Sequence, residues 1–451
     1  MHSVVVGLGK TGASCLRYLA KRGIPVSATD TRRAPPGLAE LGGLADALDL
    51  RLGGFDLSLL DGASQVLMSP GVSLEEPIAR AARDRGIDVL GDVELFARNV
   101  QAPVIGITGT NGKSTVTSLV ASMAAAAGRS VLAGGNLGEP ALDLLEQPVP
   151  DLYVLELSSF QLETTSSLRL EAAVVLNVTA DHLDRYPSVA AYALAKSRIF
   201  ARAATVVLNA DDPLVAAMRG PARAATKSGN AVRTTTFSIE RADADFSLLR
   251  TGTQTLLARR GEGLLDVARM KLTGLHNAAN ALAALALGEA AGLPVPAMLA
   301  ALESFPGLSH RSEWIADVAG VRYIDDSKGT NVGATIAAVA GMPGPLVMIA
   351  GGEGKGQDFA PLARAFRGKV RHVVLIGKDA PALAAALAGV CTLETVASMQ
   401  EAVAAATRVA RGDGDTVLLS PACASLDMFR DYAHRGDVFA AAVRELEREL
   451  T

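Results

Sequence analysis

Cysteine and tryptophan are scarce in this chain of 451 residues, which contains 3 cysteines and 1 tryptophan. The cysteines Cys15, Cys391 and Cys423 are odd in number and lack the spacing of a metal site. Such a pattern favours neither a disulfide framework nor a structural zinc site. We therefore expect a protein of a reducing compartment.

The chain also lacks a strongly basic segment and a long apolar run. With a net charge of -4, it does not offer the dense Lys/Arg face that nucleic-acid phosphates require. Glu289, Pro294 and Pro296 interrupt the alanine-rich stretch 281–302 before about 20 apolar residues accumulate, so we expect no membrane span. The opening "MHSVVVG" is typical of a strand, so we expect no signal peptide. These absences favour a cytoplasmic protein whose partners are small molecules.

Hydrophobic residues, at 49%, are numerous enough to form several cores. Short Val/Ile/Leu runs alternate with longer Ala/Leu-rich patterns, which is typical of an α/β fold with mostly parallel sheets. Breaks near Pro103 and at Pro306 and Gly307 predict three domains, at residues 1–91, 92–307 and 308–451. A small antiparallel excursion is expected between residues 229 and 272. Strands are expected at residues 3–6, 25–29, 66–68, 87–90, 103–107, 130–132, 152–156, 173–177, 205–208, 321–325, 346–350, 372–376 and 416–419.

The first strand leads into a glycine fingerprint, "VVVGLGKTG". Gly7, Gly9 and Gly12 open a helix, and Asp30 ends the following strand. This pattern is typical of a Rossmann-like domain that binds a dinucleotide. By itself it indicates a pyrophosphate, and an NAD-dependent oxidoreductase is one interpretation of it.

A second glycine-rich loop, "GTNGKST", follows the strand expected at 103–107 and precedes a helix. Glycines let backbone N–H groups converge on phosphate oxygens, Lys113 supplies a positive charge and Ser114 an oxygen ligand for Mg²⁺. The loop departs from the common form G-x-x-x-x-G-K-[ST], because Ile107 occupies the first glycine position. We predict an ATP-binding loop; a tight turn with an exposed lysine is the alternative.

Polar side chains also follow later strands. Glu156 ends an apolar strand beside the predicted phosphate loop, where it is either a metal ligand or a solvated carboxylate. His182, in "TADHLD", is by itself more typical of a structural hydrogen bond than of a metal ligand. From the residues alone, we interpret Lys196 as an ordinary solvated lysine on a helix. Loops around Lys355 and Ser425 end later strands without indicating a substrate.

Eight stretches together resemble a known family. They are "GTNGKST", "ELSSFQLE", "NVTADHLDRY", "GLHNAANALAA", "SHRSEW", "DDSKGTN", "AGGEGKGQDF" and "LSPACASLDMF". In this order they resemble the Mur ligases, the ATP-dependent amide-forming enzymes of peptidoglycan precursor synthesis, over essentially the whole chain. Their particular form is similar to that of the branch that adds D-glutamate to UDP-N-acetylmuramoyl-L-alanine. The resemblance implies a Rossmann-like N-terminal domain, a central P-loop-type ATPase domain and a Rossmann-like C-terminal domain.

The resemblance also implies a role for each motif. The first glycine loop would hold the UDP of a nucleotide sugar, with no nicotinamide. The implied UDP-sugar contacts are Lys10, Thr11, Asp30, Thr31, Arg32, Gly71, Asn136, Ser158, Gln161 and His182. The implied ATP contacts are Gly109, Thr110, Asn111, Gly112, Lys113, Ser114, Thr115, Asn277, Asn280, Arg311, Asp326 and Lys328. The implied D-glutamate contacts are Thr330, Lys355, Ser425, Leu426 and Tyr432.

Two Mg²⁺ ions are implied as well, held by Ser114, Glu156, His182 and Lys196. Lys196 would act as a carbamate formed with CO₂, which turns a cation into an anionic oxygen ligand. The implied catalytic residues are Lys113, Glu156, His182 and Lys196, and the implied enzyme is a monomer. Three alternatives remain at this point: another amino-acid-adding enzyme of the same superfamily, including the folylpolyglutamate synthases, an NAD-dependent oxidoreductase, and an ATP-hydrolysing switch protein.

Overall fold

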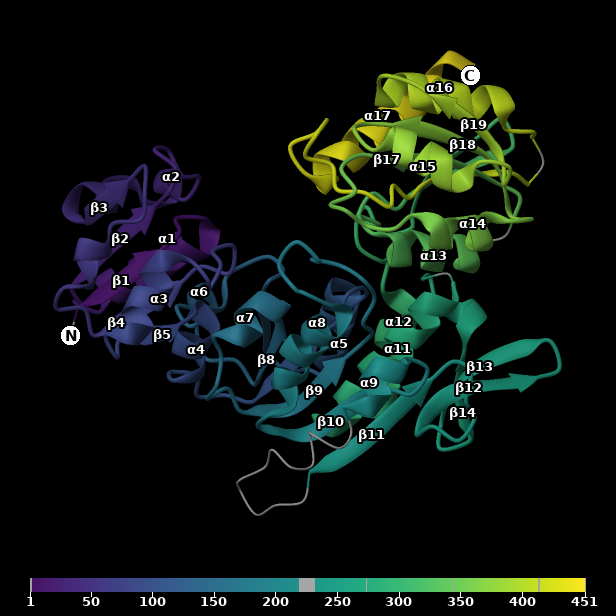
Figure 1. The fold of residues 1–451 in the computed structure, drawn as a ribbon. Helices are drawn as coiled ribbons and strands as arrows, with labels where there is room; N and C mark the ends of the chain where they lie inside the picture. The colour runs from purple at the N-terminus through teal and green to yellow at the C-terminus, as the bar shows by residue number, and fades with distance from the viewer. Residues whose placement is uncertain (1, 219–231, 273, 343, 413, 451) are drawn as a thin grey trace.

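The computed structural model of the chain describes residues 2–218, 232–272, 274–342, 344–412 and 414–450. Three separate sheets follow one another, each with its own helices, and confirm the expected three-domain α/β fold. Figure 1 shows the first domain in purple and the last in yellow-green, on either side of a teal central domain. The exact limits of the domains stay a prediction. Among the described residues, no helix has the length and apolar character needed to cross a membrane.

The first sheet is wholly parallel, in the order β3-β2-β1-β4-β5. This order puts the carboxyl end of β1 at a switch point of the topology, where open α/β sheets bind ligands. The strands are β1 (Ser3–Val6), β2 (Val26–Asp30), β3 (Asp49–Leu52), β4 (Gln65–Met68) and β5 (Asp88–Leu90). The helices are α1 (Lys10–Lys21), α2 (Leu38–Leu41), α3 (Pro77–Asp84) and α4 (Asp92–Ala97).

The central sheet has the order β14-β13-β12-β11-β10-β9-β6-β8-β7. It is parallel from β7 to β12, and β13 and β14 are antiparallel. The strands are β6 (Val104–Thr108), β7 (Val131–Gly135), β8 (Leu152–Glu156), β9 (Leu170–Val175), β10 (Ala203–Asn209), β11 (Arg233–Ser238), β12 (Phe246–Thr251), β13 (Gln254–Arg259) and β14 (Glu262–Asp266). The helices are α5 (Lys113–Ala126), α6 (Ala141–Leu144), α7 (Ser159–Glu163), α8 (Val189–Ser197), α9 (Pro213–Ala217), α11 (Leu275–Ala290) and α12 (Val295–Ser304).

The C-terminal sheet has the order β15-β16-β20-β17-β18-β19, with only β15 antiparallel. The strands are β15 (Glu313–Val318), β16 (Val321–Asp325), β17 (Leu346–Gly351), β18 (Val370–Ile376), β19 (Thr392–Thr395) and β20 (Thr416–Leu419). The helices are α13 (Val332–Gly341), α14 (Ala360–Phe366), α15 (Ala380–Leu387), α16 (Met399–Val409) and α17 (Tyr432–Leu450).

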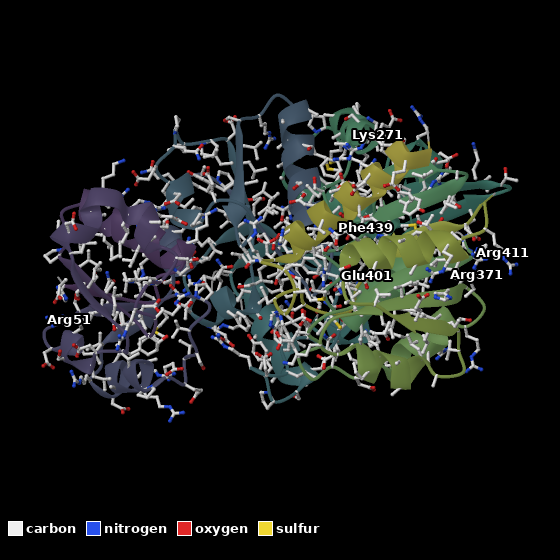
Figure 2. The ribbon with its side chains drawn as sticks, turned by 90° about the horizontal axis from the view of Figure 1, so that it is seen from above. Arg51, Lys271, Arg371, Glu401, Arg411 and Phe439 are labelled. Carbon is white, nitrogen blue, oxygen red and sulfur yellow. The ribbon has the colours of Figure 1, made fainter. Side chains whose placement is uncertain are left out.

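The first two domains share a hydrophobic core. Phe96 of α4 and Tyr153 of β8 lie in one buried cluster, with ring centroids 5.3 Å apart in an edge-on arrangement. The opposite face of the central sheet is covered by α5, α11 and α12. The C-terminal domain has cores of its own, one of which contains the fully buried Phe439 of α17. Figure 2 shows Phe439 within this domain, Arg371 and Arg411 at its outer end, and Arg51 at the far end of the molecule.

Three strands were not expected from the sequence, namely β3, β15 and β19. Each lies at the edge of its sheet and exposes part of its length, so it lacks the continuous apolar run that marks the interior strands. The expectation for residues 229–272 is partly right. The strands β12 to β14 form the antiparallel part, whereas β11 and β12 extend the parallel sheet. Residues 229–231 and 273 lie outside the described residues.

Candidate active site

The loop between β6 and α5 has an unusual backbone conformation. Gly109 and Gly112 have φ angles of 155° and 83°, which favour glycine. A Cβ on Gly112 would lie 2.5 Å from Asn280 Oδ1, so α11 also excludes a side chain there. Gly112 caps α5 without a side chain, which leaves N–H groups of the first turn directed at the loop. Backbone geometry therefore supports phosphate binding by this loop.

Glu156, at the end of β8, lies against the first turn of α5. Ser114 Oγ donates a hydrogen bond of 2.6 Å to Glu156 Oε2, and Asn136 Nδ2 donates one of 2.7 Å to Oε1. Arg311, from the C-terminal domain, donates from Nη2 to Ser114 Oγ at 2.6 Å. The hydroxyl and carboxylate oxygens form a hard-oxygen donor set of the kind that Mg²⁺ prefers.

Two lysines lie beside the same loop. Lys113 Nζ donates to the carbonyl oxygens of Gly109 and Thr110 at 2.9 and 2.8 Å. Lys196, on α8, has 1% of its surface exposed and donates to Gly109 O at 2.8 Å. Burial and the neighbouring Lys113 hold the pKa of Lys196 well below its usual value. The sequence interpretation of Lys196 as a solvated lysine is therefore wrong.

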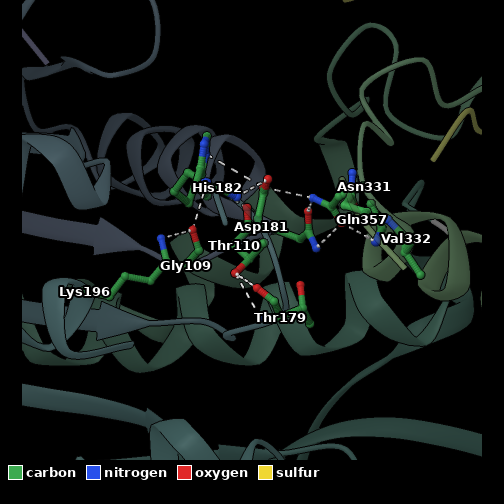
Figure 3. A network of polar contacts seen from close by, with 12 residues as sticks. Gly109, Thr110, Thr179, Asp181, His182, Lys196, Asn331, Val332 and Gln357 are labelled. Atoms are coloured by element: carbon green, nitrogen blue, oxygen red, sulfur yellow. Dashed lines mark hydrogen bonds and ion pairs between the residues drawn. The ribbon is translucent and has the colours of Figure 1, made fainter. Parts of the chain in front are cut away.

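His182 lies next to Lys196 in an aromatic surrounding. Its ring centroid is 4.9 Å from that of Phe160 and 6.0 Å from that of Tyr192. Burial lowers its pKa, against the opposing effect of Asp181, which favours the neutral imidazole with a lone pair for a ligand. Figure 3 shows His182 and Asp181 above the loop, with Lys196 pointing at Gly109.

A cavity of about 270 Å³ lies between the central and C-terminal domains, beside the loop between β6 and α5 (residues 109–112), which we call the phosphate loop. Asn280 Nδ2 donates to Asn277 Oδ1 at 3.2 Å on its α11 side. The cavity brings together eight of the residues predicted to contact ATP: Asn111, Gly112, Thr115, Asn277, Asn280, Arg311, Asp326 and Lys328.

Charged groups on the C-terminal side of this cavity are strongly perturbed. Burial raises the pKa of Asp326 to about 7, although Ser420 Oγ donates to its carboxylate at 2.8 Å. Burial and the nearby Arg311 lower the pKa of Lys328 to about 8. Lys328 Nζ lies 3.7 Å from the centroid of the Tyr432 ring. Buried groups with shifted pKa values in a cleft are typical of functional sites.

The first domain presents its own polar loop. Asp30 accepts hydrogen bonds from Leu8 N at 2.6 Å and from Arg32 Nη2 at 2.7 Å. Burial alone would raise the pKa of Asp30, but these bonds outweigh it and hold the pKa below its usual value. Lys10 Nζ donates to Gly138 O of the central domain at 2.8 Å. The other three predicted contacts of this domain are partly buried or exposed near the same strand ends: Thr11, Thr31 and Gly71.

Ser158 and Gln161, two of the residues predicted to contact the UDP-sugar, also stabilise the start of α7. Ser158 and Gln161 form a capping box at the start of α7, with Gln161 N donating to Ser158 Oγ at 3.2 Å and Ser158 N to Gln161 Oε1 at 3.0 Å. Gln161 Nε2 also donates to Asp92 Oδ2 at 3.5 Å. Burial raises the pKa of Asp92 to about 6. In this arrangement both polar atoms of the Gln161 side chain form hydrogen bonds within the protein.

The residues predicted to hold D-glutamate belong to the C-terminal domain, where four lie on loops and Tyr432 begins α17. Glu353 N donates to Ala424 O at 3.0 Å and Ala424 N to Glu353 O at 2.9 Å. This bridge joins the loop of the exposed Lys355 to the loop of Ser425, which is 3% exposed. The remaining three are the exposed Leu426 and the partly buried Thr330 and Tyr432.

Several residues at this site were missed by sequence reasoning. Asn177 Oδ1 accepts a hydrogen bond of 2.8 Å from Asn111 N and so holds the phosphate loop. His276 lines the cavity, and burial lowers its pKa to about 4. Asn331 joins the C-terminal domain to the loop. These residues lie in the motifs "LNVTADH", "GLHNAAN" and "DDSKGTN". In the sequence, only their position beside predicted site residues in these motifs could have indicated them.

Three family descriptions match separate parts of the chain. "Mur ligase MurD-like, N-terminal domain" matches residues 1–91, "Mur ligase middle domain" matches residues 107–288 and "Mur ligase, glutamate ligase domain" matches residues 310–423.

Whole-chain relatives agree with these matches. The chain is 56% identical to the UDP-N-acetylmuramoylalanine--D-glutamate ligase of Nitrosococcus oceani, over 98% of this chain and 96% of the relative. It is 49% identical to the enzyme of that name from Pseudomonas aeruginosa, over 98% of both. Among solved structures, UDP-N-acetylmuramate-alanine ligase MurC of Thermotoga maritima shares the fold, with a TM-score of 0.62, 19% identity and 99% coverage of both chains. By these matches, the chain belongs to the Mur ligase family.

Proposed function

We propose that the chain joins D-glutamate to UDP-N-acetylmuramoyl-L-alanine with consumption of ATP, as a cytoplasmic step of peptidoglycan precursor synthesis. The proposal is carried by relatives that are named for this reaction and that match nearly the whole chain. The loop at Gly109, with Lys113, Ser114 and Glu156 beside it, supports an ATP-dependent mechanism.

Amide formation from a free carboxylate is slow because oxide is a poor leaving group. In the proposed reaction the L-alanyl carboxylate attacks the γ-phosphorus of ATP and releases ADP. The amine of D-glutamate then attacks the acyl phosphate, and the tetrahedral intermediate collapses to the amide and phosphate. Lys113 and Arg311 would stabilise the negative charge of the phosphoryl group in transfer.

The donor set at the loop fits Mg²⁺. Ser114, Glu156 and His182 would hold one or two ions, which neutralise phosphate charge when bound. Lys196 would add a carbamate oxygen, because its low pKa leaves the neutral amine that reacts with CO₂.

The three domains would divide the substrates among them. We propose limits at residues 1–91 for UDP-sugar binding, 92–307 for ATP and 308–451 for the amino acid. In this scheme Lys10, Asp30 and Arg32 face the UDP-sugar. Lys355 would pair with a carboxylate of D-glutamate, and Ser425 would donate a hydrogen bond. A monomer suffices, because every proposed contact comes from one chain.

A phosphate-release assay tests the proposal. The pure protein is incubated with ATP, Mg²⁺ and UDP-N-acetylmuramoyl-L-alanine, together with D-glutamate, L-glutamate, L-lysine, meso-diaminopimelate or no amino acid. Release that depends on both the nucleotide sugar and D-glutamate is expected. Release with another amino acid would move the enzyme to a different ligation step. Release indifferent to both substrates would indicate a switch-type ATPase instead.

A further inference from the structure

Asn331, which has no role in the chemistry proposed above, connects the C-terminal domain to the phosphate loop. Its Nδ2 donates to Asn111 Oδ1 at 3.2 Å and to Asp181 Oδ2 at 3.3 Å. Its Oδ1 accepts from Ala334 N at 2.8 Å and so caps α13. The residue is 3% exposed. Both hydrogens and the oxygen of this amide are therefore used in a place that water barely reaches, with two loops of the central domain as partners (Figure 3).

Val332, the residue after Asn331, connects the start of α13 to the loop that contains Lys355. Val332 N donates to Gln357 Oε1 at 3.0 Å, and Gln357 Nε2 donates to Gly354 O at 3.0 Å. We call residues 354–357 the amino-acid loop, because it contains Lys355. Lys355 has a φ angle of 52°, an unusual conformation for a side-chain-bearing residue. Gln357 thus closes the turn that presents Lys355 and ties that turn to the start of α13.

We propose that Asn331 and Gln357 are positioning residues that hold the amino-acid loop in register with the phosphate loop. The series runs from Gly354 through Gln357 and Val332 to Asn331, and from there to Asn111 and Asp181. The inference rests on the proposed function for the identity of the two substrates. Its physical reason is that the amino-acid loop can bind D-glutamate within reach of an acyl group activated in a different domain only when the two loops are held at a fixed separation.

Asn331→Ser separates positioning from folding. Serine caps helices about as well as asparagine, so α13 keeps its cap, but serine is too short to reach Asn111 or Asp181. Loss of two buried hydrogen bonds predicts about a tenfold rise in the KM for D-glutamate. The KM for the nucleotide sugar should change less than about twofold, because the first domain lies outside the series. The melting temperature should fall only modestly, because α13 keeps its cap and the two lost hydrogen bonds join separate domains.

Gln357→Leu breaks the same series at its other end and should raise the KM for D-glutamate similarly. Because the two residues act in series, the double variant should resemble either single variant. Ser398→Ala is the matched control. Ser398 caps α16 of the same domain by accepting from Glu401 N at 3.2 Å, so its loss should lower the melting temperature and leave the KM unchanged.

Hydrogen exchange tests the connection whatever the amino acid is. A non-hydrolysable ATP analogue with Mg²⁺ should slow amide exchange in residues 354–357 of the wild type and have no such effect in Asn331→Ser. Equal protection in both proteins would overturn the proposal, as would no protection in the wild type or an unchanged KM in Asn331→Ser. A wild type without D-glutamate-dependent phosphate release would refute the proposed function alone, because the exchange measurement still decides the connection.

Discussion

Lys113 and Lys196 direct their side-chain nitrogens at one acceptor, the carbonyl oxygen of Gly109, at 2.9 and 2.8 Å. Two ammonium groups that share an acceptor at this distance repel each other. Burial, reinforced by this repulsion, lowers the pKa of Lys196. Conversion of Lys196 to a carbamate, as proposed above, would replace this repulsion with an attraction to Lys113.

Lys196→Ala should abolish nearly all ligase activity, because it removes the proposed carbamate oxygens. A short carboxylate such as acetate should restore part of the rate by occupying the vacated space. The measurement is phosphate release with increasing acetate. Lys113→Ala serves as the control: it should fail at phosphoryl transfer, gain nothing from acetate and still bind the nucleotide sugar. Unchanged turnover in Lys196→Ala would remove this residue from the site.

Arg311→Ala should lower kcat by about 10²- to 10³-fold, as expected for the loss of a charge-stabilising donor. Arg311 Nη2 contacts Ser114 Oγ at 2.6 Å, and lysine cannot reproduce the planar guanidinium, so Arg311→Lys should recover little of the rate. Steady-state kinetics with all three substrates checks this. The KM for the nucleotide sugar should stay near that of the wild type; a rise confined to that KM would contradict the assignment.

Gly12→Ala should disrupt the first glycine loop. A Cβ on Gly12 would lie 2.0 Å from Gly7 O, so the strand and helix must separate, at a cost of about 1–3 kcal/mol in unfolding free energy. Calorimetry should show at least tenfold weaker binding of the nucleotide sugar and unchanged binding of an ATP analogue. Gly9→Ala is the matched control for folding, since a Cβ added there would have no atom within 4 Å other than those of its own residue and its chain neighbours. Equal stability of the two variants would refute the steric argument.

Asp326→Asn should remove a pH dependence of stability. The pKa of Asp326 is raised to about 7, so between roughly pH 4 and 7 the folded state keeps a proton that the unfolded chain releases. Stability contributed at this residue therefore falls as the pH rises through that range. The variant should be about 1–3 kcal/mol more stable than the wild type at pH 8 and equally stable at pH 4.

Urea unfolding across this pH range measures the difference. The low pKa of Lys328, about 8, acts in the opposite direction and at higher pH, because the unfolded chain then holds the extra proton. The two effects therefore separate in pH. A wild-type profile as flat as that of Asp326→Asn between pH 4 and 7 would show that Asp326 is ionised throughout.

Elements that depend on a short stretch of residues could be predicted from the sequence. Continuous apolar runs marked the interior strands, and glycines followed by Lys113 and Ser114 marked the turn between β6 and α5. The order of the motifs was enough to indicate the family. Edge strands such as β15 and β19 escaped detection because exposed strands have no distinctive apolar pattern.

The surroundings of each side chain depend on the fold of the whole chain. Lys196 and an ordinary surface lysine look alike in a sequence, and the difference is the burial supplied by segments far along the chain. In the sequence, Asn331 likewise indicates no more than a helix cap. Its hydrogen bond to Asn111, 220 residues away, forms only because the C-terminal domain packs against the central domain. Electrostatic and hydrogen-bond energies depend on distance and solvent exposure, and the long-range packing of the three domains sets both.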